Sequence, residues 1–494
     1  MKNTLIIMLV LFITMVFGLT IKGIKGNPSP VAIEDQLRVR GEPFELSPER
    51  GRYALTMSLA QNHSFFLKKD IAKFVTPDLG VVNDKFIILF SPGVSLLATP
   101  LYILGAKFNL AQVFTFSLIS IFSLLNFLLI VKICSQLKVG FRSSLIGGFT
   151  YLFATPAFAY SVSFYQHQIT TFLLLATTTL LFSKRNLLKL TLASFLVGVS
   201  FWIDSQNPIF FIPLIVYAIN TSFNFIKKNS VTKISFHLNH LLAFLGVAVA
   251  IGSYMVYSYL VFHKPFELSG SATSVGSFDA NDNPVINISI GKKDVTQFFN
   301  PRFMTHGSAT LIFNQDRGII YYTPIMLLAL FGIKNVFENE RKKAAALLGT
   351  LLFIFTLYLM WGDPYGGWAF GPRYLIPVFA FAGIFLTVAF TSYGKKLWFK
   401  ILFSVLFIYS VAVNLLGALT TNQVPPKVEA VPLHMDWNYL LNWKMFVSGI
   451  TSSFFYKTYA HNYLSLYYYA GIIFILIILV GLALVWFPEK KGDK

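Results

Sequence analysis

Acidic and basic residues that could transfer a proton or bind a phosphate lie close together near the start of the chain. Glu49 is followed by Arg50 and Arg52, two guanidinium groups that would hold a carboxylate ionised and able to accept a proton. The run Ser47-Pro48-Glu49 is also typical of a helix start, with proline in the first turn and an acid near the positive end of the helix dipole. The sequence therefore leaves two interpretations of Glu49 open, a capping acid and a general base.

The same region contains further candidates. Asp35 or Glu45 could serve as the base in place of Glu49, and Arg52 or Lys85 could contact a phosphate. Asp78 precedes Lys85 and is a further acidic site candidate.

A second group of unusual residues follows an apolar stretch that ends at Trp361. Five glycines and prolines between Gly362 and Gly371 predict a tight loop, which contains the site candidates Asp363 and Trp368. Arg373 comes next, at the mouth of an apolar helix, where its fixed fork of donors suits a phosphate. The alternative is an arginine that extends to the lipid headgroups at the same depth.

Three more candidates stand at predicted helix ends. His167 lies in a very short turn, where a lone histidine is more often a packing residue than a catalyst. Asp204 would cap the next helix, and Asp316 would form a surface ion pair with Arg317. No compact Asp-x-Asp pair appears in the loops, so no cofactor is expected and a divalent metal, although possible, is not indicated.

These residues would be positioned by membrane helices. Hydrophobic residues make up 55% of the 494 residues and charged residues only 12%, a balance that a water-soluble domain does not tolerate. Runs of about 20 apolar residues predict transmembrane helices. Twelve such runs occur, at 4–21, 110–134, 143–163, 168–183, 187–203, 207–224, 236–262, 318–336, 344–361, 374–392, 398–420 and 466–487.

The distribution of charge predicts which loops face outward. The stretch 86–108 is broken by Pro92, Gly93 and Pro100, and we interpret it as an interfacial helix. Half of the 40 Lys and Arg residues but only 4 of the 21 acids then fall in cytoplasmic segments. Both termini are then cytoplasmic, in a multi-pass protein of the plasma (inner) membrane. The basic residues punctuate apolar runs instead of forming one polar face, so nucleic acid is not an expected partner.

The resulting fold class is an all-α polytopic membrane protein with about 12 transmembrane helices and interfacial helices in a long first outer loop. The predicted segments are a first transmembrane helix at 1–21, the first outer loop with surface helices at 22–109, transmembrane helices at 110–262, an outer loop at 263–317, transmembrane helices at 318–420, an outer loop at 421–465, and a last helix with a cytoplasmic tail at 466–494.

Four local patterns, in this order and topology, resemble the GT-C superfamily of polyprenyl-phosphate-sugar-dependent glycosyltransferases. The similarity is to the family grouped with protein O-mannosyltransferases and the aminoarabinose transferase of lipid A. The patterns are Glu49-Arg50-Gly51-Arg52-Tyr53-Ala54-Leu55, Ser91-Pro92-Gly93-Val94-Ser95-Leu96-Leu97-Ala98-Thr99-Pro100, His167 in its short turn, and Phe370-Gly371-Pro372-Arg373-Tyr374-Leu375-Ile376-Pro377.

The resemblance implies transfer of a sugar from a polyprenyl-phosphate donor to an acceptor protein, lipid or glycan at the outer face, by inverting displacement. Glu49 would be the base, although the family more often has Asp, and Arg373 would bind the donor phosphate. Many relatives carry a lysine directly before the Pro-Gly turn, where this chain has Phe90-Ser91 and its nearest lysine is Lys85. The alternatives are a multi-span transporter or flippase, and a glycan polymerase or ligase that uses lipid-pyrophosphate donors.

Overall fold

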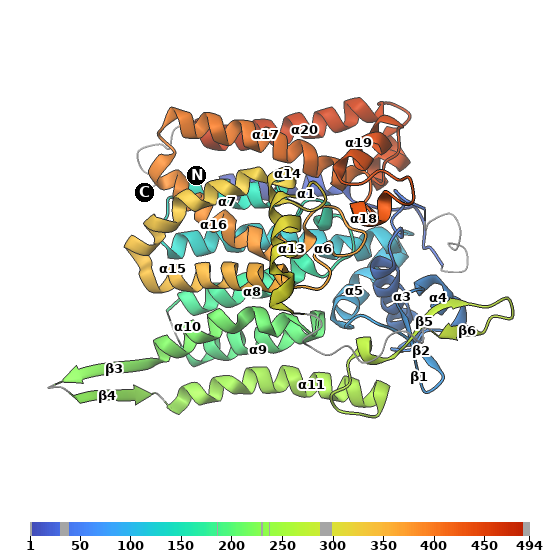
Figure 1. Ribbon diagram of the computed structural model, residues 1–494, viewed down its shortest axis with the longest axis horizontal. Coiled ribbons are helices and arrows are strands. Elements are labelled where there is room, and N and C mark those ends of the chain that lie inside the picture. The colour runs from blue at the N-terminus through green and yellow to red at the C-terminus, as the bar shows by residue number, and fades with distance from the viewer. Residues whose placement is uncertain are drawn as a thin grey trace.

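Long apolar helices lie side by side across the molecule, and smaller elements gather at one end of them (Figure 1). Within the described part of the chain, seven helices are long and apolar enough to cross a membrane, and four apolar helices are shorter. The computed structural model describes residues 2–29, 39–184, 186–228, 231–236, 238–286 and 299–487. The helices that lie side by side are α1 (Lys2–Thr20), α6 (Ala111–Gln136), the 13-residue α7 (Phe141–Phe153), α8 (His167–Phe182), α9 (Leu187–Ile203), α10 (Ile212–Ser222), α11 (Phe244–Phe262), α15 (Leu330–Leu359), α16 (Ile376–Tyr393), α17 (Leu397–Leu419) and α20 (Leu466–Trp486).

These helices follow the predicted spans, with two differences. The span expected over 143–163 is helical only as far as Phe153, and the chain then forms the short 3-10 helix η1 (Ala159–Ser161). The spans expected at 318–336 and 344–361 both fall within one assigned helical stretch, which is interrupted at Glu340 by non-helical backbone angles (φ −142°, ψ 59°). The two arms on either side of Glu340 correspond to the two predicted spans, and the number twelve stays a prediction.

Helix α16 is the central helix of the bundle. Every residue from Ile376 to Phe390 is buried. Two glycines on its neighbours permit the close packing: a Cβ on Gly147 of α7 would lie 2.2 Å from the Gly383 carbonyl oxygen, and one on Gly332 of α15 would lie 1.9 Å from that of Phe385. Arg373, just before α16, is thus attached to the most tightly held helix.

The remaining helices and a small antiparallel sheet lie mostly at the end of the bundle opposite the N and C labels (Figure 1). We call this end the outer end, because the predicted outer segments meet there. Its elements include α3 (Ser47–Asn62), α4 (Lys69–Val75), α5 (Gly93–Lys107), α13 (Met304–Ser308), α14 (Ile319–Tyr322), α18 (Lys427–Ala430), α19 (Tyr439–Val447), and the strands β1 (Leu79–Val82), β2 (Lys85–Ile88), β5 (Thr273–Phe278) and β6 (Pro284–Ile286), ordered β2-β1-β5-β6.

Two expectations for the first outer loop are wrong in detail. The helix α3 begins at Ser47 with Pro48 in its first turn, as predicted, but every residue from Glu49 to Ser58 is buried, so α3 is not a surface helix. The apolar stretch 86–108 is not one helix, because its first residues pair as β2 with β1 and only α5 is helical. The sheet joins the first and second outer segments through β1 and β5, a long-range pairing that the sequence did not indicate.

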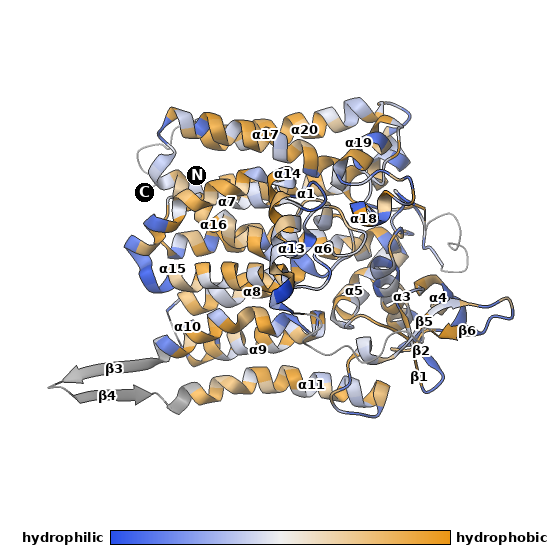
Figure 2. Cartoon of the chain, in the orientation of Figure 1, coloured by the Kyte–Doolittle hydropathy of each residue, from blue (hydrophilic) through white to orange (hydrophobic). Residues whose placement is uncertain are grey.

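Hydrophobic residues fill the helices, whereas hydrophilic residues gather at the two ends of the bundle (Figure 2). The opposite end carries the hairpin of β3 (Phe223–Lys228) and β4 (Val231–Phe236), which projects away from the helices. The chain is therefore a multi-pass membrane protein with an all-α membrane part.

The orientation can be tested with two exposed lysines that both pair with a glutamate. Lys264 pairs with Glu267 in the predicted outer segment, and Lys334 pairs with Glu338 in a predicted cytoplasmic segment. In a Cys134→Ala background, Lys264→Cys should react with a membrane-impermeant maleimide in right-side-out vesicles, and Lys334→Cys only in inside-out vesicles. The reverse pattern would show that the outer end faces the cytoplasm.

Candidate active site

The ring of Tyr165 lies at the centre of a cluster of side chains from three separate segments. The guanidinium carbon of Arg52, on α3, is 5.8 Å from the centre of this ring, and that of Arg373, before α16, is 5.4 Å from it. The imidazole of His167 stacks on the same ring at 6.1 Å with an interplanar angle of 10°. Tyr165 itself is buried and interacts electrostatically with Glu49. We refer to Glu49, Arg52, Tyr165, His167 and Arg373 as the outer cluster.

The start of α3 is anchored by side chains that are not themselves free for chemistry. The Ser47 hydroxyl donates a hydrogen bond to the Asp78 carboxylate. Arg50 donates to the carbonyl oxygens of Phe44, Glu45 and Thr76, at 2.9 to 3.2 Å. Asp78 and Arg50 therefore position the first turn of α3, and with it Glu49.

Glu49 is completely buried, and neither of its carboxyl oxygens has a hydrogen-bond partner that satisfies normal geometry. The pKa of Glu49 is raised to about 8, chiefly by burial and also by the carboxylate of Glu45, while Lys22, the Phe164 backbone amide and Arg50 act in the opposite direction. Desolvation thus acts against the expectation that the neighbouring arginines hold Glu49 ionised: Arg50 lowers its pKa, but by less than burial raises it. Nor do its oxygens cap α3, so the geometry favours a group that exchanges a proton.

Arg52 connects α3 to two other helices of the bundle. One guanidinium nitrogen donates to the Pro48 carbonyl at 3.1 Å, and another donates to the Gln166 side chain at 2.7 Å. The Gln166 amide in turn donates to the Asp204 carboxylate at 3.3 Å, after the end of α9. Burial raises the pKa of Asp204 and lowers that of Arg52 to about 10, and the nearby charge of Arg373 also lowers the latter. The buried guanidinium of Arg52 and the partly buried one of Arg373 repel each other, which favours an anion between them.

Arg373 owes its position to the glycine-rich loop before α16. Gly366 and Gly371 have positive φ angles of 71° and 58°, which glycine adopts without strain. A Cβ on Gly366 would lie 3.3 Å from the Arg373 Nε and 3.1 Å from the ring of Tyr374. The Nε of Arg373 is buried without a hydrogen-bond partner, and its guanidinium lies 5.4 Å from the Tyr374 ring centre. The loop thus holds a cation whose hydrogen-bonding capacity is not exhausted.

His167 is the first residue of α8 and is 6% exposed. Its ring packs edge to face on Tyr160 at 5.6 Å and on Tyr374 at 6.1 Å. Its Nε2 has no hydrogen-bond partner. The packing interpretation accounts for the ring, but it leaves one nitrogen available to a ligand.

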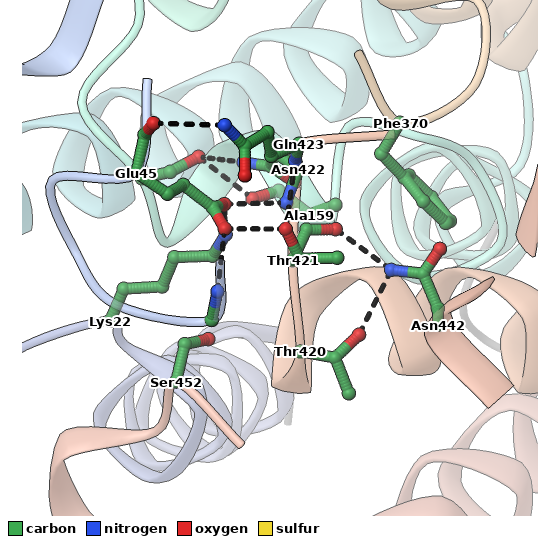
Figure 3. A network of polar contacts seen from close by, with 12 residues as sticks. Lys22, Glu45, Ala159, Phe370, Thr420, Thr421, Asn422, Gln423, Asn442 and Ser452 are labelled. Atoms are coloured by element: carbon green, nitrogen blue, oxygen red, sulfur yellow. Dashed lines mark hydrogen bonds and ion pairs between the residues drawn. The ribbon is translucent and has the colours of Figure 1, made fainter. Parts of the chain in front are cut away.

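Glu45 has a different environment from that of Glu49. Its carboxylate forms a fully buried ion pair with Lys22 at 3.1 Å and also accepts hydrogen bonds from the Gly41 amide at 2.8 Å, the Asn422 amide at 2.7 Å, and the Thr421 hydroxyl (Figure 3). A carboxylate with this many donors is poorly suited to accept a substrate proton. Glu45 is therefore a structural acid beside the outer cluster.

Asp316 connects two outer segments instead of forming a surface ion pair. Its Oδ1 accepts the Lys427 backbone amide at 2.9 Å, and the residue is 4% exposed. The neighbouring Arg317 is fully buried and donates to the carbonyls of Asp316, Tyr365, Gly367 and Val424 at 2.8 to 3.1 Å. These two residues hold the loops that surround Arg373.

The candidates Asp363 and Trp368 also shape this region. Asp363 accepts hydrogen bonds from the amides of Tyr365 and Gly367 and thereby closes its own loop. The Trp368 indole donates to Glu429 at 2.6 Å, and Arg40 lies over its ring at 5.7 Å.

Lys85 and Asp35 do not join the outer cluster. Lys85 is exposed on β2 with its ammonium 4.7 Å from the Phe66 ring centre, and among the described contacts none links it to Arg52 or Arg373. Asp35 lies outside the described residues. Among the residues that are described, no group of three His, Cys, Asp or Glu side chains has a metal-binding arrangement.

The sequence alone did not single out three residues on which this site depends. Tyr165 and Gln166 stand directly before His167, so the short turn itself was the available signal. Lys22 follows the first apolar helix, where a charged residue marks only the end of the apolar run. Its burial and its ion pair come only from tertiary contacts.

Two cavities lie away from the outer cluster. A cavity of about 330 Å³ lined mostly by apolar side chains of α8, α9, α10 and α11 includes Leu181, Leu190 and Phe244. A second, of about 230 Å³, is lined by Lys138, Glu340 and neighbours. Neither contains a residue of the outer cluster.

No family model and no curated protein sequence matches this chain. Several solved structures, however, resemble it in fold. ArnT from Cupriavidus metallidurans in the apo state superposes with a TM-score of 0.51 at 13% identity, covering 98% of this chain and 77% of that one. ArnT bound to undecaprenyl phosphate gives a TM-score of 0.49 at 14% identity, covering 98% and 76%. The archaeal oligosaccharyltransferase AglB from Archaeoglobus fulgidus, in complex with an inhibitory peptide and a dolichol-phosphate, gives 0.48 at 11% identity, covering 87% and 58%.

The likeness to apo ArnT shows that the chain shares its overall fold. This confirms the helical, polytopic membrane fold expected from the sequence. At such low identity the likeness is one of fold alone, and the specific family is not established by it.

The raised pKa of Glu49 makes a prediction about stability. An unfolded Glu titrates near 4.5 and the folded one near 8, so the folded state loses stability as the pH rises between these values. Glu49→Gln removes this loss. The melting temperature of Glu49→Gln minus that of the wild type should therefore be larger at pH 9 than at pH 5.5. An equal difference at both values, measured by thermal unfolding in detergent, would contradict a raised pKa.

Proposed function

We propose that this protein is a membrane glycosyltransferase that moves a sugar from a polyprenyl-phosphate donor to an acceptor at the outer face, by inverting displacement with Glu49 as the base. The acceptor is a protein, a lipid or a glycan. The enzyme would reside in the plasma membrane with both termini in the cytoplasm.

The observation that carries this proposal is the arrangement around Tyr165. Two cations, Arg52 and Arg373, lie against the same ring, and the buried carboxyl of Glu49 beside it has both oxygens free of partners. A phosphate between the two guanidinium groups would relieve their mutual repulsion. The free carboxyl is then available for the hydroxyl that attacks the sugar.

The chemistry requires only positioning and charge stabilisation. The acceptor oxygen forms a bond to the anomeric carbon, the bond from that carbon to the phosphate oxygen breaks, and the polyprenyl phosphate leaves with the bonding electrons. The acceptor proton passes to the carboxylate of Glu49. Arg52 and Arg373 stabilise the negative charge that develops on the leaving phosphate. His167 Nε2, which has no protein partner, is placed to contact a sugar hydroxyl.

Further support comes from the fold shared with apo ArnT and from the sequence resemblance to the GT-C family. The sequence resemblance implies a polyprenyl-phosphate donor. Neither identifies the sugar, so the choice between a hexose and a pentose is left to experiment.

The roles of Arg52 and Arg373 can be tested by substitution, with Lys85 as the control cation. In a reconstituted assay with a radiolabelled polyprenyl-phosphate sugar, Arg373→Ala and Arg52→Ala should each lower kcat/KM by about a hundredfold or more, the effect expected for loss of a group that stabilises transition-state charge. Lys85→Ala removes a cation that contacts Phe66 instead, and it should retain most of the activity.

Glu49→Gln should abolish transfer while donor binding persists, because the amide keeps the shape of the side chain but cannot accept the proton. Donor binding is measured by tryptophan fluorescence or calorimetry on the same preparations. Full transfer activity in Glu49→Gln and Arg373→Ala would refute the site. Transport of the donor without bond formation would instead support a flippase.

A further inference from the structure

Two buried carboxyl groups compete for one buried ammonium group at the outer end. The side chains of Lys22 and Glu45 are both 0% exposed, and Glu49 is equally buried. Electrostatic interactions couple Glu49 to both Lys22 and Glu45. With both carboxylates ionised, this trio carries a net negative charge away from water, which is costly. One of the two acids is therefore expected to hold a proton.

The hydrogen bonds distinguish the two acids. Every group that contacts the Glu45 carboxyl is a donor: the Lys22 ammonium and the Asn422 amide on one oxygen, and the Gly41 amide and the Thr421 hydroxyl on the other (Figure 3). A protonated carboxyl has an O–H that needs an acceptor. Of these partners only the Thr421 hydroxyl can accept, and its oxygen already accepts the Gln423 backbone amide at 2.8 Å. Glu45 is thus built to be ionised.

We infer that Glu45, by holding the Lys22 ammonium in a donor-saturated ion pair, leaves the proton of this trio on Glu49 and so acts as the positioning residue that sets the proton affinity of the base. The location of the proton follows from the contacts alone. Its consequence for catalysis rests on the proposed function.

The other groups facing Glu49 are consistent with this assignment. Arg50, beside it on α3, is engaged with backbone carbonyls. Tyr160 and Tyr165 interact electrostatically with Glu49, and burial raises the pKa of both phenols, so they stay neutral. The Lys22 ammonium hydrogen-bonds to Glu45, and Arg40 also interacts electrostatically with Glu45. The Phe164 backbone amide and Arg50 lower the pKa of Glu49, but by less than burial raises it. The pKa of about 8 for Glu49 agrees with a proton held there at neutral pH.

Neutralising Glu45 should change the proton affinity of Glu49. Glu45→Gln removes the competing negative charge and releases the Lys22 ammonium, which can then stabilise an ionised Glu49. The pKa of Glu49 should fall by about one to three units, the range typical of a change in one nearby charge. Lys22 and Glu45 do not contact the substrate in this scheme.

The proton can be located by infrared spectroscopy on the full-length protein in lipid nanodiscs. A buried, protonated carboxylic acid gives a carbonyl-stretch band that shifts in D2O. The wild type should show such a band that loses half its intensity near pH 8. Glu49→Gln should lack it, and Glu45→Gln should show it titrating at lower pH. Asp204→Asn identifies any part of the band that comes from Asp204. Glu42→Gln is the matched control, because it removes an acid that is paired with Lys457 and lies outside the trio.

A band that persists in Glu49→Gln and disappears in Glu45→Gln would place the proton on Glu45 and overturn the inference, as would the absence of a titrating band in the wild type. If Glu45→Gln does not fold, the wild type and Glu49→Gln still decide the location. Where transfer activity is detected, the acid limb of the kcat/KM profile should follow the band, near pH 8 in the wild type and lower in Glu45→Gln. A protein with the predicted band but no transferase activity would refute the proposed function and leave the proton assignment intact.

Discussion

The arrangement of the outer end depends on the buried ion pair between Lys22 and Glu45. Removing two charges from water costs several kcal/mol per ion, and this is offset only when the remaining lone pairs and protons are satisfied. Here the offset comes from the backbone and hydroxyl donors of Gly41, Thr421 and Asn422. The pair therefore joins the end of α1, the loop before α3 and the segment after α17. Because α3 starts two residues after Glu45, this junction also fixes where Glu49 lies.

A second buried cation stabilises the opposite side of the site by other means. Arg317 has no carboxylate partner among its described hydrogen bonds and is satisfied by four backbone carbonyls, including those of Gly367 and Val424. Hydrogen bonds from a charged donor are stronger than neutral ones. The loop that positions Arg373 is thereby joined to the segment that contains Thr421. The two cations of the outer cluster thus come from separately anchored parts of the chain, which keeps them close to Tyr165 despite their mutual repulsion.

Local sequence patterns predicted those features that depend on local physics. Apolar runs located the membrane helices, and Ser47-Pro48 located the first turn of α3. Length, hydropathy and helix-start residues are all properties of a single local segment of sequence. The burial of α3 was not predictable in this way. Its charged first turn is typical of a surface helix, and contacts with Asp78, the carbonyls that accept from Arg50, and Gln166 make that burial tolerable. The distinct roles of the neighbouring acids Glu45 and Glu49 likewise depend on Lys22 and Asn422, which are distant in sequence.

For Glu49 in the proposed role of base, the geometry imposes a compromise. With a pKa of about 8, only roughly one Glu49 in ten is ionised at pH 7, which would lower the fraction of protein competent for the proposed reaction. The same raised proton affinity makes the ionised form a stronger base than an exposed carboxylate, and general-base catalysis is most efficient when the pKa lies near the working pH. An arginine paired directly with Glu49 would reverse both effects. Placing Lys22 on Glu45, and Arg52 and Arg373 toward Tyr165, therefore separates the charges that would bind a phosphate from the group that would accept the proton.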